Sequence, residues 1–140
     1  MLSVVIPTRN RRATLVDTLA RVLAQECPSS GFEVIVVDNG STDETADALA
    51  DLARRSGGRL RGLREPLRGP AAARNTGAAA ASGEVIVFLG DDTEPADDQL
   101  LASHAAHHEA HPGRPSGQAA SQRQVVVRPP AAHHGFGSGE

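Results

Sequence analysis

The stretch EVIVFLGDDTEP, residues 84–95, decides the fold and raises the question of a site. Its first half is an apolar run rich in β-branched residues, which is typical of a strand buried on both faces. The run leads directly into two adjacent carboxylates, Asp91 and Asp92. Because like charges at this spacing repel, we expect the pair either to be balanced by a cation or to lie in open water.

On both sides of this stretch the chain alternates between strand and helix patterns. The predicted strands are residues 2–7, 32–37, 59–65 and 84–89, and the predicted helices are residues 11–25, 41–55, 70–82 and 96–108. Buried strands that alternate with helices imply parallel strands joined by right-handed crossovers. The sequence therefore predicts an α/β fold with a Rossmann-like, mostly parallel sheet flanked by helices.

Helix ends are marked by particular residues. Ser41 and Glu44 have the spacing of a capping box, which predicts that the second helix begins there. Pro70 suits the first turn of the third helix, and Gly83 lies just past its predicted end.

Composition excludes several classes of protein. A length of 140 residues is that of about one domain. The net charge of −3 does not suggest general binding to nucleic acid, which needs a positively charged surface. No apolar run approaches the ~20 residues of a membrane helix. The single cysteine, Cys27, excludes an internal disulfide and fits a reducing compartment. Because no signal-peptide pattern precedes the first strand, we expect the cytoplasm as the location.

The chain divides at Pro112. Residues 1–112 carry the strand and helix patterns, whereas residues 113–140 are rich in Gly, Pro, Ser and Gln and are predicted to be a disordered tail. The histidines between residues 104 and 111 have helical spacing. We interpret them as an exposed polar face, with a transition-metal site as the alternative.

Three polar segments follow predicted strands: PTRNR at residues 7–11, DNGSTDE at 38–44 and GDDTEP at 90–95. Each by itself is compatible with an ordinary solvated turn. Ligands of parallel sheets bind beyond the carboxyl ends of the strands. We therefore expect all three segments on one rim, where together they favour a binding site.

Several common ligand-binding and catalytic motifs are missing from the sequence, and their absence excludes the corresponding kinds of site. The turn after the first strand contains no glycine, which excludes a dinucleotide fingerprint, and no Walker-type lysine loop or Gly-x-Ser-x-Gly elbow occurs. The remaining interpretation of Asp91 and Asp92 is a divalent cation, Mg²⁺ or Mn²⁺, shared with substrate phosphates.

Three blocks of the sequence carry a family resemblance. SVVIPTRNR (3–11), EVIVVDNGSTDET (33–45) and RGPAAARNTGAAAASGEVIVFLGDDTEP (68–95) resemble, in order and spacing, the N-terminal half of family-2 glycosyltransferases, which have the GT-A fold. The resemblance extends from about Leu2 to His111. It implies a domain at residues 1–112 that binds a nucleotide-diphospho-sugar, commonly a UDP-sugar. It also implies transfer of the sugar to an acceptor with inversion; the acceptor is unknown.

The resemblance also implies roles for particular residues. The implied donor-binding residues are Pro7, Thr8, Arg9, Asp38, Arg68, Arg74 and Asp91, and the implied metal ligands are Asp91 and Asp92. The first three would lie beside the base, and Asp38 would hydrogen-bond it. Arg68 or Arg74 would approach the diphosphate. Two alternatives stay open: Asp38 as the cap of the turn DNGS, and Arg74 as part of an exposed helical face.

The sequence departs from the family pattern in two places. Gly90 stands where many members carry a further carboxylate, so we expect weak metal affinity. After Pro112 no acceptor domain and no Glu-Asp pair follow, so the catalytic base is not assigned and the sheet should have an open edge. The chain then reads as a truncated or frame-shifted, inactive fragment.

Two alternatives to a glycosyltransferase are a non-catalytic nucleotide-sugar-binding remnant and a sugar-nucleotide nucleotidyltransferase. The missing base favours the remnant. The nucleotidyltransferase should carry a glycine-rich loop after the first strand, and PTRNRRA lacks one.

Overall fold

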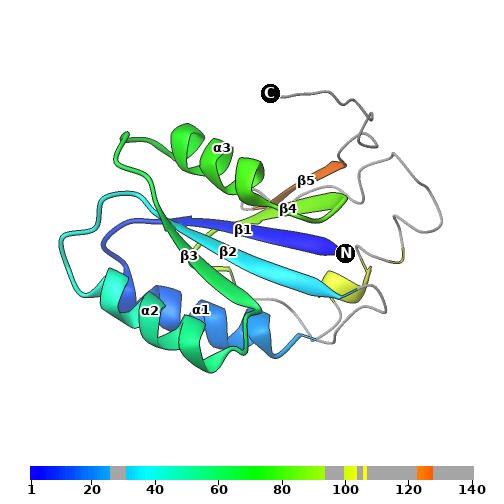
Figure 1. Ribbon diagram of the computed structural model, residues 1–140, viewed down its shortest axis with the longest axis horizontal. Helices are drawn as coiled ribbons and strands as arrows, with labels where there is room; N and C mark the ends of the chain where they lie inside the picture. Colours follow the sequence, from blue (N-terminus) through cyan, green and yellow to red (C-terminus); the bar gives the residue numbers. More distant parts are fainter. Residues whose placement is uncertain (26–30, 94–99, 104–105, 107–122, 128–140) are drawn as a thin grey trace.

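The computed structural model consists of one sheet between two layers of helices (Figure 1). The structure describes residues 1–25, 31–93, 100–103, 106 and 123–127. The elements are β1 (Leu2–Thr8), α1 (Arg12–Leu23), β2 (Phe32–Asp38), α2 (Thr45–Arg55), β3 (Leu60–Arg64), α3 (Pro70–Ala80), β4 (Val85–Leu89) and β5 (Arg123–Val127). Within this described part, no helix is long and apolar enough to cross a membrane.

The sheet has five strands in the order β3-β2-β1-β4-β5. The first four strands of the chain run parallel to one another, and β5 is antiparallel to β4. The prediction of a mostly parallel sheet flanked by helices is confirmed. Thr8 stands opposite Asp38 in the register of β1 and β2, so these two strands end at the same level.

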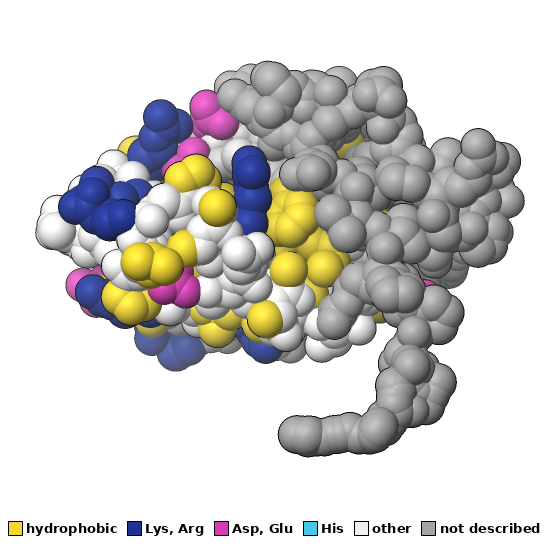
Figure 2. Space-filling view, turned by 90° about the horizontal axis from the view of Figure 1, so that it is seen from above, with side chains coloured by type: hydrophobic (Ala, Val, Ile, Leu, Met, Phe, Trp, Pro, Cys, Tyr) yellow, Lys and Arg dark blue, Asp and Glu magenta, His cyan; other side chains and the backbone are white. Residues whose placement is uncertain are grey.

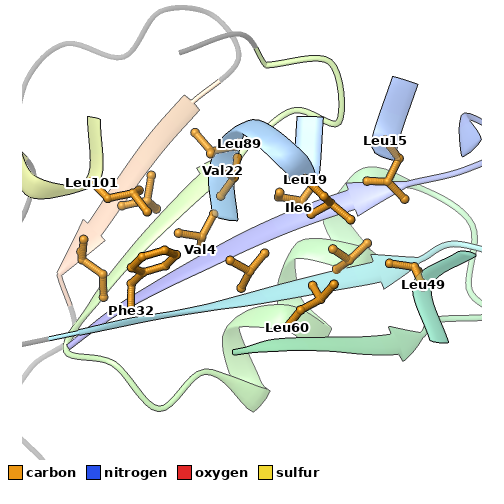
Figure 3. Packing of buried hydrophobic residues seen from close by; sticks show 14 of the residues in the cluster. Val4, Ile6, Leu15, Leu19, Val22, Phe32, Leu49, Leu60, Leu89 and Leu101 are labelled. Carbon is orange, nitrogen blue, oxygen red and sulfur yellow. The ribbon is translucent and has the colours of Figure 1, made fainter. Parts of the chain in front are cut away.

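Alternation along the buried strands divides the core between the two faces of the sheet. Val4 and Ile6 of β1 pack with Leu15, Leu19 and Val22 of α1 in the larger cluster, which Figure 3 shows from close by. α1 and α2 cover this face, and α3 covers the other (Figure 1). The chain has only three phenylalanines and no tyrosine or tryptophan. The core is therefore built mostly from aliphatic residues, with Phe32 and Phe88 among them.

The α3 face holds a smaller cluster, in which valine, isoleucine and phenylalanine of the sheet meet alanines of the helix. Gly77 of α3 is buried, and a Cβ placed on it would lie 2.3 Å from Cγ1 of Val5. The small residues of α3 therefore allow the helix to approach the sheet closely. Pro70 is in the first turn of α3, as predicted.

The predicted capping box at the start of α2 is wrong. The helix begins at Thr45, and neither Ser41 nor Glu44 makes a side-chain cap. The Ser41 hydroxyl instead accepts a hydrogen bond from the backbone N–H of Asn10, at 2.9 Å, and the Ser41 N–H donates to Asp38 Oδ1, at 3.0 Å. The hydroxyl of Ser41 therefore bonds to the loop after β1 and its N–H bonds to Asp38, so Ser41 does not cap the helix.

The expectation of a disordered tail at residues 113–140 is corrected at β5. Val125 of β5 stands opposite Val87 in the antiparallel pairing with β4. The β-branched run at residues 125–127 supplies the backbone partners that the edge of β4 would otherwise lack. The edge that we expected to be open beside β4 is therefore covered.

Other sequence predictions fall on segments that are not described. The predicted helix at residues 96–108 is described only at 100–103 and 106, which are helical, and Leu101 there is buried in the larger cluster. The histidines of residues 104–111 and the remainder of the predicted tail lie outside the described residues.

Candidate functional site

The loops that follow β1, β2 and β4 meet at the carboxyl end of the sheet. The Thr8 hydroxyl donates to Asp91 Oδ2 at 2.9 Å, which joins the first loop to the third. The Asn10 side-chain oxygen accepts the backbone N–H groups of Thr42, at 2.7 Å, and of Asp43, at 3.2 Å, which joins the first loop to the second. The prediction that these three segments share one rim is confirmed.

Asn10 has a left-handed backbone, with φ of 53°. Asparagine adopts this conformation more readily than most residues. Its side chain can therefore turn back toward the loop after β2 from a sharp bend between β1 and α1. Asn10 was not among the site residues predicted from the sequence; an asparagine directly before the predicted helix at residues 11–25 is the signal that could have found it.

A cleft of about 690 Å³ opens on this rim. Its described lining is Pro7, Thr8, Arg9, Arg11, Asn39, Arg68, Gly69, Pro70 and Asp91. Basic side chains are visible at this end of the molecule in Figure 2, on the left. Five residues that were predicted from the sequence, Pro7, Thr8, Arg9, Arg68 and Asp91, are brought together here. Three arginines against one carboxylate make the described lining suited to an anion.

Asp91 is held firmly at the end of β4. It is 9% exposed, and its backbone oxygen accepts the Thr18 hydroxyl at 2.7 Å. Its Oδ1 lies 3.3 Å from Nη1 of Arg11, and Oδ2 of Asp92 lies 3.6 Å from the same nitrogen. One guanidinium therefore offsets part of the charge of the two adjacent carboxylates in the structure.

Arg11 is a residue of the site that the sequence analysis missed. It stands at the N-cap position of α1, two residues after Arg9, and its side chain is about half exposed. A second arginine in the turn after β1 was the available signal. Its pairing with residues eighty positions away was not visible in the local pattern.

The acid pair fits a divalent cation that is shared with a ligand. Asp91 and Asp92 offer carboxylate oxygens, which suit Mg²⁺ or Mn²⁺. Among the described residues, no group of three His, Cys, Asp or Glu side chains could hold a metal ion. One or two carboxylates completed by substrate phosphates is the usual protein site for Mg²⁺. The donor set thus fits a cation held jointly with a phosphate ligand better than one held by the protein alone.

Asp38 lies beside the cleft and faces a second cavity. This cavity measures about 270 Å³ and is lined by Asp38 with Ala46, Leu49, Ala50, Ala53, Gly62, Leu63 and Arg64. Oδ1 of Asp38 accepts the Ser41 N–H, so the interpretation as a turn cap is confirmed. Oδ2 is buried and has no hydrogen-bond partner within the described part of the chain. One oxygen of this carboxylate therefore remains available as an acceptor.

Asn39 ties the loop between β3 and α3 to the cleft. Its side-chain nitrogen donates to the backbone oxygens of Glu65, at 2.9 Å, and Leu67, at 2.8 Å. Its side-chain oxygen accepts the N–H of Gly69 at 3.0 Å. These bonds bracket Arg68, which lines the cleft, so Asn39 positions the loop that carries this arginine. This role of Asn39 was not predicted from the sequence.

Glu65 strengthens the same loop from its other side. Its carboxylate accepts the hydroxyl of Thr76 in α3 and the N–H of Leu67. These hydrogen bonds, with that from Thr76 the larger cause, hold the pKa of Glu65 below its ordinary value. The loop is thus anchored to both β2 and α3.

Arg74 and Asp92 are not among the described residues that line the cleft. Arg74 lies on α3, with its guanidinium carbon 6.0 Å from the centre of the Phe88 ring. Asp92 is next to Asp91 and shares its contact with Arg11. Of the two arginines that were considered for a diphosphate, the structure therefore brings Arg68 to the cleft.

Comparisons with known proteins agree with this geometry. The family model for glycosyl transferase family 2 matches residues 3–122. The PGL/p-HBAD biosynthesis glycosyltransferase of Mycobacterium tuberculosis is 39% identical over 106 residues, which are 76% of this chain and 41% of that protein. The chain thus spans less than half of this relative.

Two structures that were solved in complex with nucleotide-sugars have a similar fold. Mannosyltransferase PcManGT from Pyrobaculum calidifontis, in complex with GDP-Man and Mn²⁺, is 31% identical with a TM-score of 0.73, over 80% of this chain and 33% of that one. S. aureus TarS 1-349, in complex with UDP-GlcNAc, is 27% identical with a TM-score of 0.69, over 84% of this chain and 37% of that one. The chain belongs to glycosyl transferase family 2.

Proposed function

We propose that this chain binds the nucleotide-diphospho-sugar donor of a glycosyltransferase, with a divalent cation, Mg²⁺ or Mn²⁺, between the acid pair and the diphosphate. The observation that carries the proposal is the cleft at the carboxyl end of the sheet, whose described lining includes Arg9, Arg11, Arg68 and Asp91. Support also comes from two similar solved structures, one with GDP-Man and Mn²⁺ and one with UDP-GlcNAc.

The described side chains divide the work of holding the donor. Arg68 would hydrogen-bond phosphate oxygens, for which the planar guanidinium is well shaped. Asp91 and Asp92 would hold the cation, which when bound neutralises the charge of the leaving diphosphate. Pro7, Thr8 and Arg9 would flank the nucleoside, with Asp91 also reaching the ribose.

For the base we propose the free acceptor of Asp38. A buried carboxylate oxygen without a partner is costly unless a ligand supplies a donor. Uracil offers one imide N–H, so a UDP-sugar is the donor we propose. The consecutive residues Asp38 and Asn39 line the two neighbouring cavities, which leaves room for a base beside the cleft.

The complete reaction would be transfer of the sugar to an acceptor with inversion. This requires a general base within about 3 Å of the acceptor hydroxyl. We assign no such base, because the only acids after Asp98, Glu109 and Glu140, lie outside the described residues. We therefore propose that these 140 residues bind the donor and by themselves transfer its sugar poorly.

We also propose the cytoplasm as the location of the protein.

Titration calorimetry with UDP and GDP tests donor binding. We expect UDP to bind more tightly in Mn²⁺ or Mg²⁺ than in chelator, and Asp92→Ala to remove most of this difference. Asp38→Ala should weaken UDP binding with and without the cation. Arg68→Ala should weaken UDP binding, whereas Arg74→Ala, the same change outside the described lining, should not.

Three outcomes would contradict parts of the proposal. Equal UDP affinity in Mn²⁺ and in chelator would contradict the proposed cation site. Tighter binding of GDP than of UDP would contradict uracil as the base of the donor. Transfer at ordinary enzyme rates, of order 1 s⁻¹, in an assay of the purified chain with nucleotide-sugars and a broad acceptor panel would show that the chain is catalytically sufficient.

A further inference from the structure

Arg11 contacts both members of the acid pair and also lines the cleft. A single guanidinium nitrogen, Nη1, lies within 3.3 Å of Asp91 Oδ1 and 3.6 Å of Asp92 Oδ2. Asp91 is fixed by Thr8 and Thr18, whereas the Arg11 side chain is 53% exposed. Asp91 is therefore held in place by hydrogen bonds, whereas the Arg11 side chain is free to move.

A divalent cation on these carboxylates would compete with Arg11. The cation and the guanidinium would then share the same oxygens, and like charges a few ångströms apart repel strongly near a protein surface. Binding of the cation alone would thus have to displace the arginine or be weakened by it. In the absence of a phosphate ligand, Arg11 offsets about half of the charge of the acid pair without a metal.

The cleft offers the displaced arginine a second partner. Arg11 lines the same cleft as Arg9 and Arg68, where the proposed function places the donor diphosphate. We propose that Arg11 is an exchangeable counter-ion: it pairs with Asp91 and Asp92 in the donor-free protein and moves to the diphosphate when cation and donor bind. This inference rests on the proposed function and makes cation binding depend on the donor.

Manganese binding to the purified chain, measured by electron paramagnetic resonance of free Mn²⁺, tests the exchange. Without nucleotide, Arg11→Gln should bind Mn²⁺ about fivefold or more tightly than the wild-type chain, in the usual range for coupled sites. Addition of UDP should tighten Mn²⁺ binding less in Arg11→Gln than in the wild type. By reciprocity, Mn²⁺ should also tighten UDP binding less in this variant.

Two variants serve as controls. Arg12→Gln removes the same charge from the neighbouring residue, which is 52% exposed and faces Glu44 instead, and should bind Mn²⁺ as the wild type does. Arg11→Lys keeps the charge and should also leave donor-free Mn²⁺ affinity near that of the wild type. Thermal unfolding of each variant verifies that the fold is retained.

The outcomes separate this inference from the proposed function. If UDP-dependent Mn²⁺ binding is present but Arg11→Gln matches the wild type without nucleotide, the exchange is wrong and the cation site stands. Tightening of the same size in Arg11→Lys or Arg12→Gln would also overturn the exchange. Absence of Mn²⁺ binding in every variant, with and without UDP, would overturn both the exchange and the proposed cation site.

Discussion

Glu33 illustrates how a single carboxylate stabilises the end of the sheet opposite the cleft. Its Oε2 accepts the Ser3 hydroxyl at 2.6 Å and the Ser82 N–H at 2.7 Å, and its Oε1 accepts Nη2 of Arg61 at 3.1 Å. Burial by itself would raise the pKa of Glu33. The hydrogen bonds and the charge of Arg61 outweigh burial and hold this pKa below the ordinary value of 4.5.

We predict that Glu33→Gln lowers the free energy of unfolding at neutral pH by about 1–3 kcal/mol, because a half-buried, charged hydrogen-bond acceptor is lost. A lowered folded-state pKa means that the stabilisation is present above pH 4.5 and is lost as pH falls through the folded-state value. Urea unfolding should therefore show the two proteins converging toward pH 3. A difference that stays constant from pH 7 to pH 3 would contradict this role of the charge.

At the scale of elements, α3 is defined by its small residues. Its buried side rests on Val5, Ile35 and Val37 of the sheet through alanine and Gly77. A larger side chain on this side would push the helix away from the sheet. The loop that carries Arg68 enters α3 directly, so the seating of this helix also bears on the cleft.

We predict that Gly77→Ala destabilises the protein although alanine is the better helix former. The propensity gain is about 1 kcal/mol. The added Cβ would lie 2.3 Å from Val5 Cγ1 and 3.2 Å from Val37 Cγ2, and overpacking of buried, branched side chains typically costs about 1–3 kcal/mol. Urea unfolding should give a net loss, whereas Asn75→Ala on the exposed side of α3 should be neutral or stabilising. Higher stability of Gly77→Ala would show that α3 shifts freely.

At the scale of the whole molecule, the two edges of the sheet are protected differently. β3 is one edge and carries Arg61 and Arg64, and charged side chains discourage pairing with another chain. On the other side, β5 covers the edge of β4. Without β5, the all-apolar strand Val85–Leu89 would present unpaired backbone groups.

We predict that removal of residues 113–140 causes concentration-dependent self-association, because the edge of β4 is then open. Light scattering coupled to size-exclusion chromatography can measure it. Removal of residues 128–140 alone keeps β5 and should behave as the full chain does. If both truncated chains remain monomeric over the same concentrations, β5 does not protect this edge.

Local features of the sequence were sufficient to predict the first four strands, the helices between them and a mostly parallel sheet, but not β5 or the strand order. Apolar runs without alternation predicted β1, β2 and β4 as buried parallel strands, and helical spacing of leucine and valine predicted α1. The general rule for ligand sites in parallel sheets then located the rim. These predictions succeeded because period and burial are properties of neighbouring residues.

Only the tertiary structure decided which side chains meet. Arg11 pairs with Asp91, Asn10 and Asp38 take hydrogen bonds from the loop before α2, and β5 joins β4 from the other end of the chain. Each of these contacts joins a polar group or a strand edge to the partner that packing brings nearest. A polar side chain or a strand edge can form equally good hydrogen bonds with several partners. The path of the backbone, rather than the local sequence, therefore decides which partner it meets.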